Sequence, residues 1–256
     1  MSEIEAKKSL GQNFLTDQNI IRKIIQAINP QVGETIIEVG PGQGALTEHL
    51  LAAGAHVIAL EMDERMLVPL DALNEKYDGR LTVIIGDALK QNLTTLTQGK
   101  YKLVGNLPYN VGTQIVFNAI KMGAHISAMT FMLQKEVIQR ITANVNDNHW
   151  GRLAVWCDLY CSRKRLFDVP PTAFFPQPKV TSSIVSLIPL DEKRFNADDK
   201  KLSYILQSTF TKRRKMLRAS LKSILDVEQI ESIGVKATQR PETLTTEQFC
   251  LLSDKL

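Results

Sequence analysis

The chain has few residues of the kinds that build disulfide frameworks or transition-metal sites. Only three of its 256 residues are cysteine and four are histidine. Cys157, Cys161 and Cys250 form a sparse, odd-numbered set, so we expect core thiols instead of a disulfide scaffold or a metal centre. The histidines are scattered without HxxxH spacing, which removes the parts of a zinc-based or histidine-based nucleophilic mechanism. We therefore expect no metal.

Long apolar runs are also missing. No uninterrupted stretch approaches the roughly 20 residues that a membrane-spanning helix needs, and the N-terminal segment is too charged for a secretory leader. Hydrophobic residues nevertheless make up 44% of the chain, which is enough to bury a sizeable core. We expect a globular, cytoplasmic protein with no membrane segment, and a monomer.

Acidic residues are absent from one stretch near the C-terminus. Residues 201–222 contain none, although the net charge of the whole chain is only +4. The basic residues there include Lys212, Arg213, Arg214, Lys215 and Arg218. Such local basicity suits a polyanion, and the alternative is the solvated face of a helix.

Alternating strand-like and helix-like segments indicate an α/β fold. Strand-forming residues recur at 34–39, 55–61, 81–87, 101–105 and 126–132, and helical patterns occur at 45–51, 65–77, 135–143 and 153–161. This alternation predicts a parallel sheet wrapped by helical crossovers. Two further strands, at 164–169 and 180–188, are joined by a proline-rich loop without a helix. They predict an antiparallel pair at one edge of a seven-stranded sheet.

The periodicity becomes purely helical after Pro189. Helical spacing covers residues 202–210, 215–225, 230–234 and 246–252. We infer two domains, an α/β domain over residues 1–189 and a small all-helical domain over residues 190–256.

A glycine-rich turn follows the first predicted strand. Gly40, Gly42 and Gly44 let the backbone approach a ligand closely, and the start of the following helix favours an anionic group. Glu61 and Asp87 end the next two strands, where carboxylates can bind ribose hydroxyls and an adenine amino group. Each carboxylate alone is equally consistent with a helix cap or a surface role. As an ordered set, they predict a nucleoside site.

The same pattern occurs in dinucleotide-binding dehydrogenases, so an NAD-dependent oxidoreductase is an alternative. Two details disfavour NAD. Ala45 and Leu46 follow G-x-G-x-G, so the third glycine of the dinucleotide fingerprint is missing from its position. An amide and aromatic motif also stands where the neighbours of a hydride donor are expected.

That motif, Asn106-Leu107-Pro108-Tyr109, directly follows the fourth predicted strand. The exocyclic amine of adenine is a poor nucleophile because its lone pair is delocalised into the ring. The Asn106 side-chain oxygen and the Leu107 carbonyl could hold both amine hydrogens and aim that lone pair. Pro108 biases Leu107 away from helix, and Tyr109 offers a face that stacks on the base. Four residues alone are also consistent with an ordinary strand-end turn.

Six ordered motifs resemble those of the ribosomal RNA adenine dimethyltransferase family, the KsgA (RsmA) type, from about residue 8 to the C-terminal helices. In order, they are Ser9–Leu15, Glu38–Thr47, Glu61–Asp63, Gly86–Ala88, Asn106–Asn110 and Phe174–Ser182. The resemblance implies a Rossmann-like class I methyltransferase sheet of seven strands that uses S-adenosylmethionine. It also implies that the C-terminal helical domain docks on RNA or the ribosome.

The resemblance assigns roles to individual residues. It implies that S-adenosylmethionine contacts Gln12, Asn13, Leu15, Gly40, Gly42, Glu61, Met62, Asp87, Ala88 and Asn106. The catalytic set would be Asn106, Leu107, Pro108, Tyr109 and Phe174, with Tyr109 and Phe174 sandwiching the flipped adenine. The basic residues named above would bind RNA. Two alternatives stay open: a helix cap and staple for residues 12–15, and an ordinary core aromatic for Phe174.

The implied reaction is methyl transfer to the N6 amines of two adjacent adenosines in a hairpin loop near the 3′ end of 16S ribosomal RNA, within the pre-30S particle. One alternative is a large-subunit rRNA methyltransferase of antibiotic resistance, whose motif usually reads Asn-Ile-Pro-Tyr where this chain has Leu107. DNA adenine methyltransferases usually have proline there and add a target-recognition domain, for which this chain has no room. The last alternative is a ribosome-assembly factor whose catalysis is incidental.

Overall fold

The computed structural model describes residues 5–7 and 11–256. Ser9 and Leu10, which begin the first sequence motif, lie outside the described residues. Contacts divide the chain into two compact units. The first comprises the residues up to Ile138 together with Arg163–Pro189, and the second comprises Gln139–Ser162 together with Leu190–Leu256.

The sequence pattern placed residues 139–162 in the first domain, whereas their contacts group them with the second unit. The physical reason is the packing of α6 (Arg152–Tyr160), which contacts both α7 (Asp199–Phe210) and α10 (Thr246–Ser253). The predicted boundary after Pro189 coincides with the last passage of the chain between the units.

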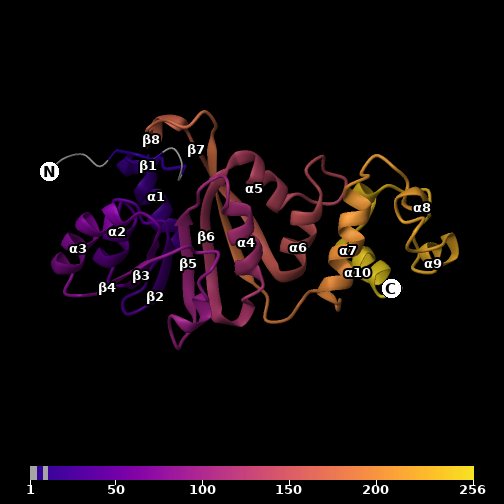
Figure 1. Cartoon of the computed structure of the whole chain (residues 1–256), viewed down its shortest axis with the longest axis horizontal. Coiled ribbons are helices and arrows are strands. Elements are labelled where there is room, and N and C mark those ends of the chain that lie inside the picture. The colour runs from indigo at the N-terminus through magenta and orange to yellow at the C-terminus, as the bar shows by residue number, and fades with distance from the viewer. Residues whose placement is uncertain (1–4, 8–10) are drawn as a thin grey trace. The chain divides into compact units, whose positions relative to one another are not determined.

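The first unit is built on a seven-stranded sheet with the order β4-β3-β2-β5-β6-β9-β7 (Figure 1). Neighbours from β4 to β6 pair in parallel, and β9 runs antiparallel to β6. This confirms the predicted α/β fold with seven strands, and β7 and β9 are neighbours at one edge as expected. The strands are β2 (Thr35–Val39), β3 (His56–Glu61), β4 (Leu81–Ile85), β5 (Tyr101–Asn106), β6 (Ile126–Gln134), β7 (Cys161–Val169) and β9 (Ser182–Pro189).

Strand order reverses between β2 and β5, and ligands of such sheets bind beyond the strand ends at this point. β2 is buried from Ile36 to Val39, as expected for a parallel strand that is covered on both faces. Its register sets Val39 opposite Gly105. The glycine turn and the Asn106 motif therefore begin side by side.

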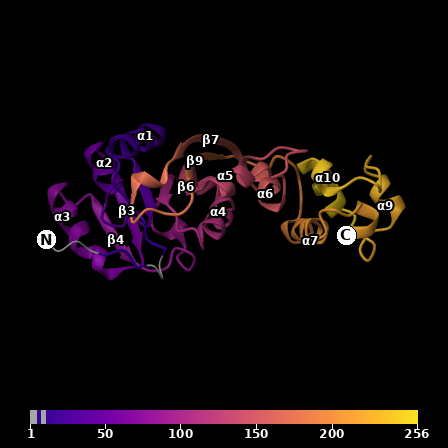
Figure 2. The same cartoon turned by 90° about the horizontal axis from the view of Figure 1, so that it is seen from above.

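Helices cover both faces of this sheet. Figure 2 shows α1 and α2 on one face and α4 on the other. α1 buries Ile21, Ile24 and Ile28 at helical spacing, and the Asp17 carboxylate caps its first turn. Neither α1 nor α4 was predicted from the sequence. The helices of this unit are α1 (Gln18–Ile28), α2 (Thr47–Ala52), α3 (Leu67–Lys76), α4 (Gly112–Ile120) and the first half of α5 (Lys135–Thr142).

A separate two-stranded ribbon was not predicted from the sequence either. β1 (Phe14–Leu15) pairs antiparallel with β8 (Phe174–Phe175), so Phe14 lies opposite Phe175 and Leu15 opposite Phe174. Leu15 and Phe174 are buried in the apolar core beside α1, whereas Phe175 is exposed. The ribbon ties the N-terminal motif to the loop between β7 and β9.

The second unit is helical, with α6, α7, α8 (Leu217–Ser220), α9 (Val227–Glu231) and α10. The predicted helix over 215–225 is shorter than expected, because its regular part is confined to α8. All three cysteines are buried and none is in a disulfide, as expected for core thiols. Within the described residues, no helix is both long and apolar enough to cross a membrane, and no cluster of metal-ligating side chains occurs.

Candidate active site

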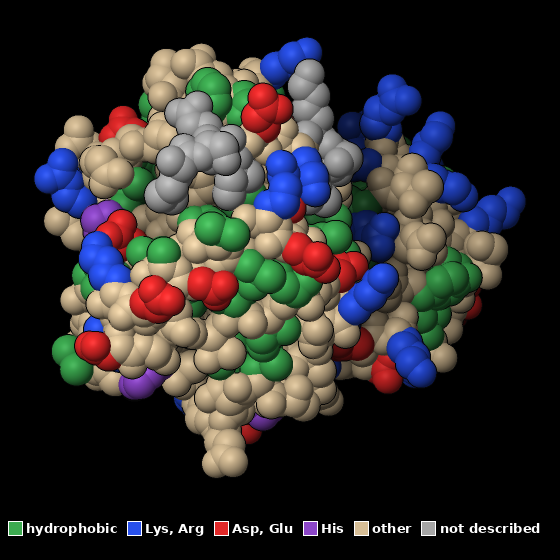
Figure 3. Space-filling view, turned by 60° about the vertical axis from the view of Figure 1, so that its left-hand side comes forward, with side chains coloured by type: hydrophobic (Ala, Val, Ile, Leu, Met, Phe, Trp, Pro, Cys, Tyr) green, Lys and Arg blue, Asp and Glu red, His purple; other side chains and the backbone are tan. Residues whose placement is uncertain are grey.

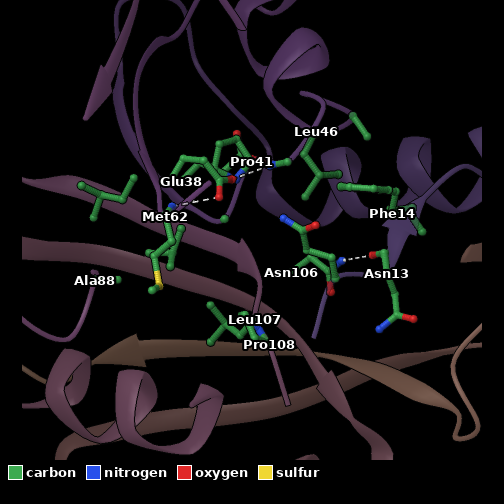
Figure 4. A pocket seen from close by; sticks show the side chains of 18 of the residues that line it. Asn13, Phe14, Glu38, Pro41, Leu46, Met62, Ala88, Asn106, Leu107 and Pro108 are labelled. Carbon is green, nitrogen blue, oxygen red and sulfur yellow. Dashed lines mark hydrogen bonds between the residues drawn. The ribbon is translucent and has the colours of Figure 1, made fainter. Parts of the chain in front are cut away.

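A cavity of about 540 Å³ lies at the carboxyl ends of β2 to β5. Its wall combines the glycine turn, the ends of β3 and β4, the Asn106 motif and the N-terminal segment (Figure 4). All ten residues predicted to contact the methyl donor line it, namely Gln12, Asn13, Leu15, Gly40, Gly42, Glu61, Met62, Asp87, Ala88 and Asn106. Leu107, Pro108 and Tyr109 line it as well. The structure thus brings these residues to one place, while their individual roles stay predictions.

The glycine turn has a backbone that side chains would not tolerate. Gly40, Gly42 and Gly44 have φ values of 69°, 56° and 89°, in the left-handed region. A Cβ on Gly44 would lie 2.4 Å from a Leu73 methyl, and one on Gly42 would lie 3.2 Å from the Phe14 ring. The turn therefore lets bare backbone form this part of the cavity wall.

Glu61 is positioned by backbone amides at the end of β3. One carboxylate oxygen accepts from Gly42 N–H at 3.1 Å, and the other accepts from Met62 and Asp63 N–H at 2.8 and 2.9 Å. Burial raises the pKa of Glu61, and these hydrogen bonds oppose the rise. A carboxylate offers about four acceptor positions, so roughly one remains for a ribose hydroxyl. To bind both hydroxyls of a ribose, Glu61 would have to accept two hydrogen bonds at one position or lose its hydrogen bond from Gly42 N–H.

Asp87, Ala88 and Met62 form another part of the wall. Asp87 accepts from Leu89 N–H at 2.9 Å with one oxygen, and its other oxygen lies 4.0 Å from the Lys90 ammonium. Met62 is 57% exposed. Figure 4 shows it on the same side of the cavity as Ala88, away from Asn13. The flexible Met62 thioether can pack against a planar base, and the Asp87 carboxylate can accept a hydrogen bond from an amino group on that base.

The N-terminal segment is anchored beside the cavity by Asp63. This buried carboxylate accepts from Gln12 Nε2 at 3.0 Å and from Lys7 Nζ at 3.3 Å. The Arg65 guanidinium also bonds it, at 2.6 and 2.9 Å. Hydrogen bonds from Arg65, which has the largest effect, and from Gln12 and Lys7 hold the pKa of Asp63 well below its usual range. From the sequence, Asp63 was part of a motif but had no predicted role.

Asn106 is oriented by the N-terminal segment. Its side-chain nitrogen donates to the Asn13 carbonyl at 3.2 Å, as the dashed line in Figure 4 shows. Because a carbonyl can only accept, this bond identifies which side-chain atom of Asn106 is the nitrogen. The side-chain oxygen is left as an acceptor. Leu107 N–H donates to the Met132 carbonyl at 3.1 Å, and no donor among the described residues bonds the Leu107 carbonyl. Two acceptors therefore stand together at the tip of β5.

Tyr109 is held by the last motif of the chain. Its hydroxyl lies 2.8 Å from the Ser182 hydroxyl, and Ser182 is fully buried at the start of β9. Burial raises the pKa of Tyr109, so the phenol is neutral at physiological pH. Ser182 ends the last sequence motif, but this contact was not predicted, because the two residues are 73 positions apart.

Phe174 is placed differently from the expectation that it stacks on the base. It is 3% exposed, packs in the apolar core and does not line the cavity. Successive side chains of a strand point to opposite faces, and in β8 this alternation turns Phe174 inward and Phe175 outward. Phe175 is 69% exposed.

Glu38 is a cavity residue that was not predicted as an individual site. It is 1% exposed within β2 and accepts from the Thr47 hydroxyl at 2.6 Å. Burial raises its pKa from 4.5 to about 7. The available signal was a carboxylate inside an otherwise apolar strand, where charge is costly.

We expect Glu38→Gln to stabilise the protein at pH 8 and to have little effect at pH 5. Between pH 4.5 and about pH 7, the Glu38 carboxyl is ionised in the unfolded chain and neutral in the folded chain. The contribution of Glu38 to stability is therefore lost as pH rises through this range. Glutamine cannot ionise and still accepts from Thr47. Urea unfolding should show the stability difference between variant and wild type growing by up to about 3 kcal/mol from pH 5 to 8. If the difference in stability between variant and wild type stayed constant from pH 5 to 8, Glu38 would not be a protonated buried carboxyl.

The predicted RNA-binding residues are not equivalent. Lys212, Arg214, Lys215 and Arg218 are exposed. Arg213 is half-buried and donates to the backbone carbonyls of residues 148 and 147 at 2.6 and 3.3 Å. The structure therefore gives Arg213 a part in holding the second unit together and leaves the other four exposed to a ligand.

Comparison with known proteins identifies the family of this chain. Residues 4–256 match the family described as ribosomal RNA adenine dimethylase. The chain is 46% identical to "Ribosomal RNA small subunit methyltransferase A" of Agrobacterium fabrum, over 99% of this chain and 94% of the relative. The protein of the same name from Acinetobacter baylyi is 42% identical, over 98% and 93%.

Two solved structures have a similar fold. A dimethyladenosine transferase from Plasmodium falciparum is similar with a TM-score of 0.80 and 26% identity, over 93% of this chain and 95% of that one. The 23S rRNA methyltransferase ErmE shares the fold, with a TM-score of 0.70 and 24% identity over 95% and 99%. The chain therefore belongs to the ribosomal RNA adenine dimethylase family and is a methyltransferase.

Proposed function

We propose that this methyltransferase modifies the N6 amines of two adjacent adenosines in a hairpin loop near the 3′ end of small-subunit ribosomal RNA, as a cytoplasmic monomer that acts on the pre-30S particle. The observation that carries the proposal is the meeting, in one cavity, of the glycine turn with the two acceptors at the tip of β5. The names of the relatives support the small subunit as substrate. The likeness to ErmE extends to the fold alone.

The cavity suits S-adenosylmethionine as the methyl donor. Its volume lies in the ordinary range of ligand cavities, about 300–1,000 Å³. The glycine turn provides bare backbone, Glu61 retains an acceptor position, and Met62 with Asp87 suits an adenine ring. When bound, this cofactor supplies a methyl group on a sulfonium centre, which a neutral amine can attack.

Side-chain and backbone groups of the motif would act on the target amine. The Asn106 side-chain oxygen and the Leu107 carbonyl would accept its two hydrogens and direct its lone pair toward the methyl group. The Tyr109 ring would stack on the base and stabilise the developing positive charge by about 0.5–2 kcal/mol. No residue has to remove a proton before transfer, which agrees with the absence of histidine from the described residues that line the cavity.

Methyl transfer to isolated ribosomal particles tests this function. Tritiated S-adenosylmethionine would be supplied with small subunits from cells that lack the activity, followed by nucleoside analysis. We expect N6,N6-dimethyladenosine in small-subunit RNA. Label in 23S RNA alone would support the antibiotic-resistance alternative, and binding without transfer would support an assembly factor.

The exposed basic residues of the second unit should contribute to RNA affinity. Figure 3 shows Lys and Arg side chains gathered at the upper right of its view, with few acidic ones among them. We expect Lys212→Ala, Arg214→Ala and Lys215→Ala each to weaken particle binding and to reduce the slope of log affinity against log salt by about 1.

Arg213→Ala serves as the matched comparison within the same run of charges. It should lower thermal stability, because two backbone carbonyls lose their donor. Equal salt slopes for wild type and all three exposed-site variants would show that this patch does not contact RNA.

A further inference from the structure

Phe175 is a large aromatic side chain that the proposed chemistry leaves unused. It is 69% exposed, while Phe174 beside it is buried. Single exposed apolar residues are common on protein surfaces. The position of Phe175, and not its exposure alone, is therefore the informative feature.

The ribbon places Phe175 next to the cavity wall. It lies directly opposite Phe14 in the β1–β8 pair. Opposite residues of an antiparallel pair project on the same face, with Cβ atoms about 4.5–5.5 Å apart. Phe14 lines the cavity, where its ring packs against the glycine turn at Gly42. Phe175 therefore belongs to the same face of the ribbon and lies farther out.

The same ribbon is connected to the catalytic motif. Asn13, which immediately precedes β1, accepts the hydrogen bond from the Asn106 side chain at 3.2 Å. Phe175 is thus one strand away from the segment that orients Asn106. A base that leaves the cavity mouth on this side would meet the Phe175 ring.

The surroundings of Phe175 suit a nucleic acid. No acidic residue occurs between positions 169 and 190. Lys179 is exposed in the same loop, and Val180 is 41% exposed. An exposed aromatic ring in a loop that carries a lysine and no acidic residue matches the composition of platforms that bind single-stranded nucleic acid.

We propose that Phe175 stacks on a nucleobase that flanks the target adenine and remains outside the cavity. This inference rests on the proposed function, because it requires an RNA substrate. A nucleotide that is extruded into a pocket leaves its neighbours without a stacking partner, and the energy of unstacking must be recovered. The Phe175 ring replaces that partner, so the residue positions RNA without touching the reacting atoms.

Three substitutions at this position separate ring stacking from general apolar contact. We expect Phe175→Ala and Phe175→Leu to raise both the KM and the dissociation constant for small subunits about tenfold, which corresponds to about 1.4 kcal/mol. Phe175→Trp should remain within about twofold of wild type, because an indole also stacks. The dissociation constant for S-adenosylmethionine and the thermal midpoint should not change in any of them.

Val68→Ala is the matched control, because Val68 is an apolar side chain 70% exposed on α3. It should leave particle binding unchanged. The inference is overturned if Phe175→Ala binds small subunits as wild type does, or if Phe175→Leu retains wild-type binding. It is also overturned if cofactor affinity falls in parallel, since Phe175 would then act through Phe14. Failure of the proposed function appears separately, as absence of methyl transfer by the wild-type protein.

Discussion

Asn106→Ala is expected to reduce the rate of methyl transfer by about 10²–10³-fold and to change the affinity for S-adenosylmethionine much less. The variant loses the side-chain acceptor at the tip of β5 while the glycine turn and Glu61 keep their geometry. The Leu107 carbonyl would remain as a single acceptor, which restrains the amine without aiming its lone pair. Single-turnover rates with saturating cofactor, together with calorimetric binding of the cofactor, measure the two effects.

Asn106→Asp sharpens this prediction. The carboxylate keeps an acceptor but cannot donate to the Asn13 carbonyl, which lies 3.2 Å from the present amide nitrogen. Two oxygens at that distance repel each other, so the side chain should turn away and the rate should also fall. Normal turnover by either variant would remove Asn106 from the mechanism.

Much of the site could be predicted because each part follows a strand within a few residues. The glycine turn follows β2, Glu61 ends β3, and Asn106 ends β5, so the parallel sheet alone brings them to one edge. The order of the strands in the sheet is enough to bring these residues to one cavity. Here local sequence and global topology give the same answer.

The parts that escaped prediction depend on contacts between distant segments. β1 and β8 have two residues each, too few for an alternating pattern to be recognised. Without that pairing, nothing in the sequence tells which of Phe174 and Phe175 is buried. Arg213 looked equivalent to its basic neighbours for the same reason, since its carbonyl partners are 65 and 66 positions away.

Gly105→Ala is expected to have a large structural effect, although it adds only one methyl group. Gly105 lies opposite Val39 in the β2–β5 pair. A Cβ there would lie 2.6 Å from the Val39 carbonyl oxygen and 3.0 Å from a Leu107 methyl. The side chain of Leu107 can move, whereas the carbonyl belongs to the backbone of β2. The two central strands would have to separate at the point where the glycine turn and the Asn106 motif both begin.

The expected result is a loss of about 1–3 kcal/mol in the free energy of unfolding and a fall of about 100-fold in transfer rate, because small misplacements of reacting groups are costly. Gly99→Ala is the matched control, because a Cβ added at Gly99 would have no heavy atom of the described residues within 4 Å and the φ of Gly99 is not in the left-handed region. That variant should stay within about 0.5 kcal/mol of wild type. Urea unfolding and single-turnover assays of both variants decide the matter. If Gly105→Ala behaved as Gly99→Ala does, the close approach of β5 to β2 would not be what sets the distance between the methyl donor and the target amine.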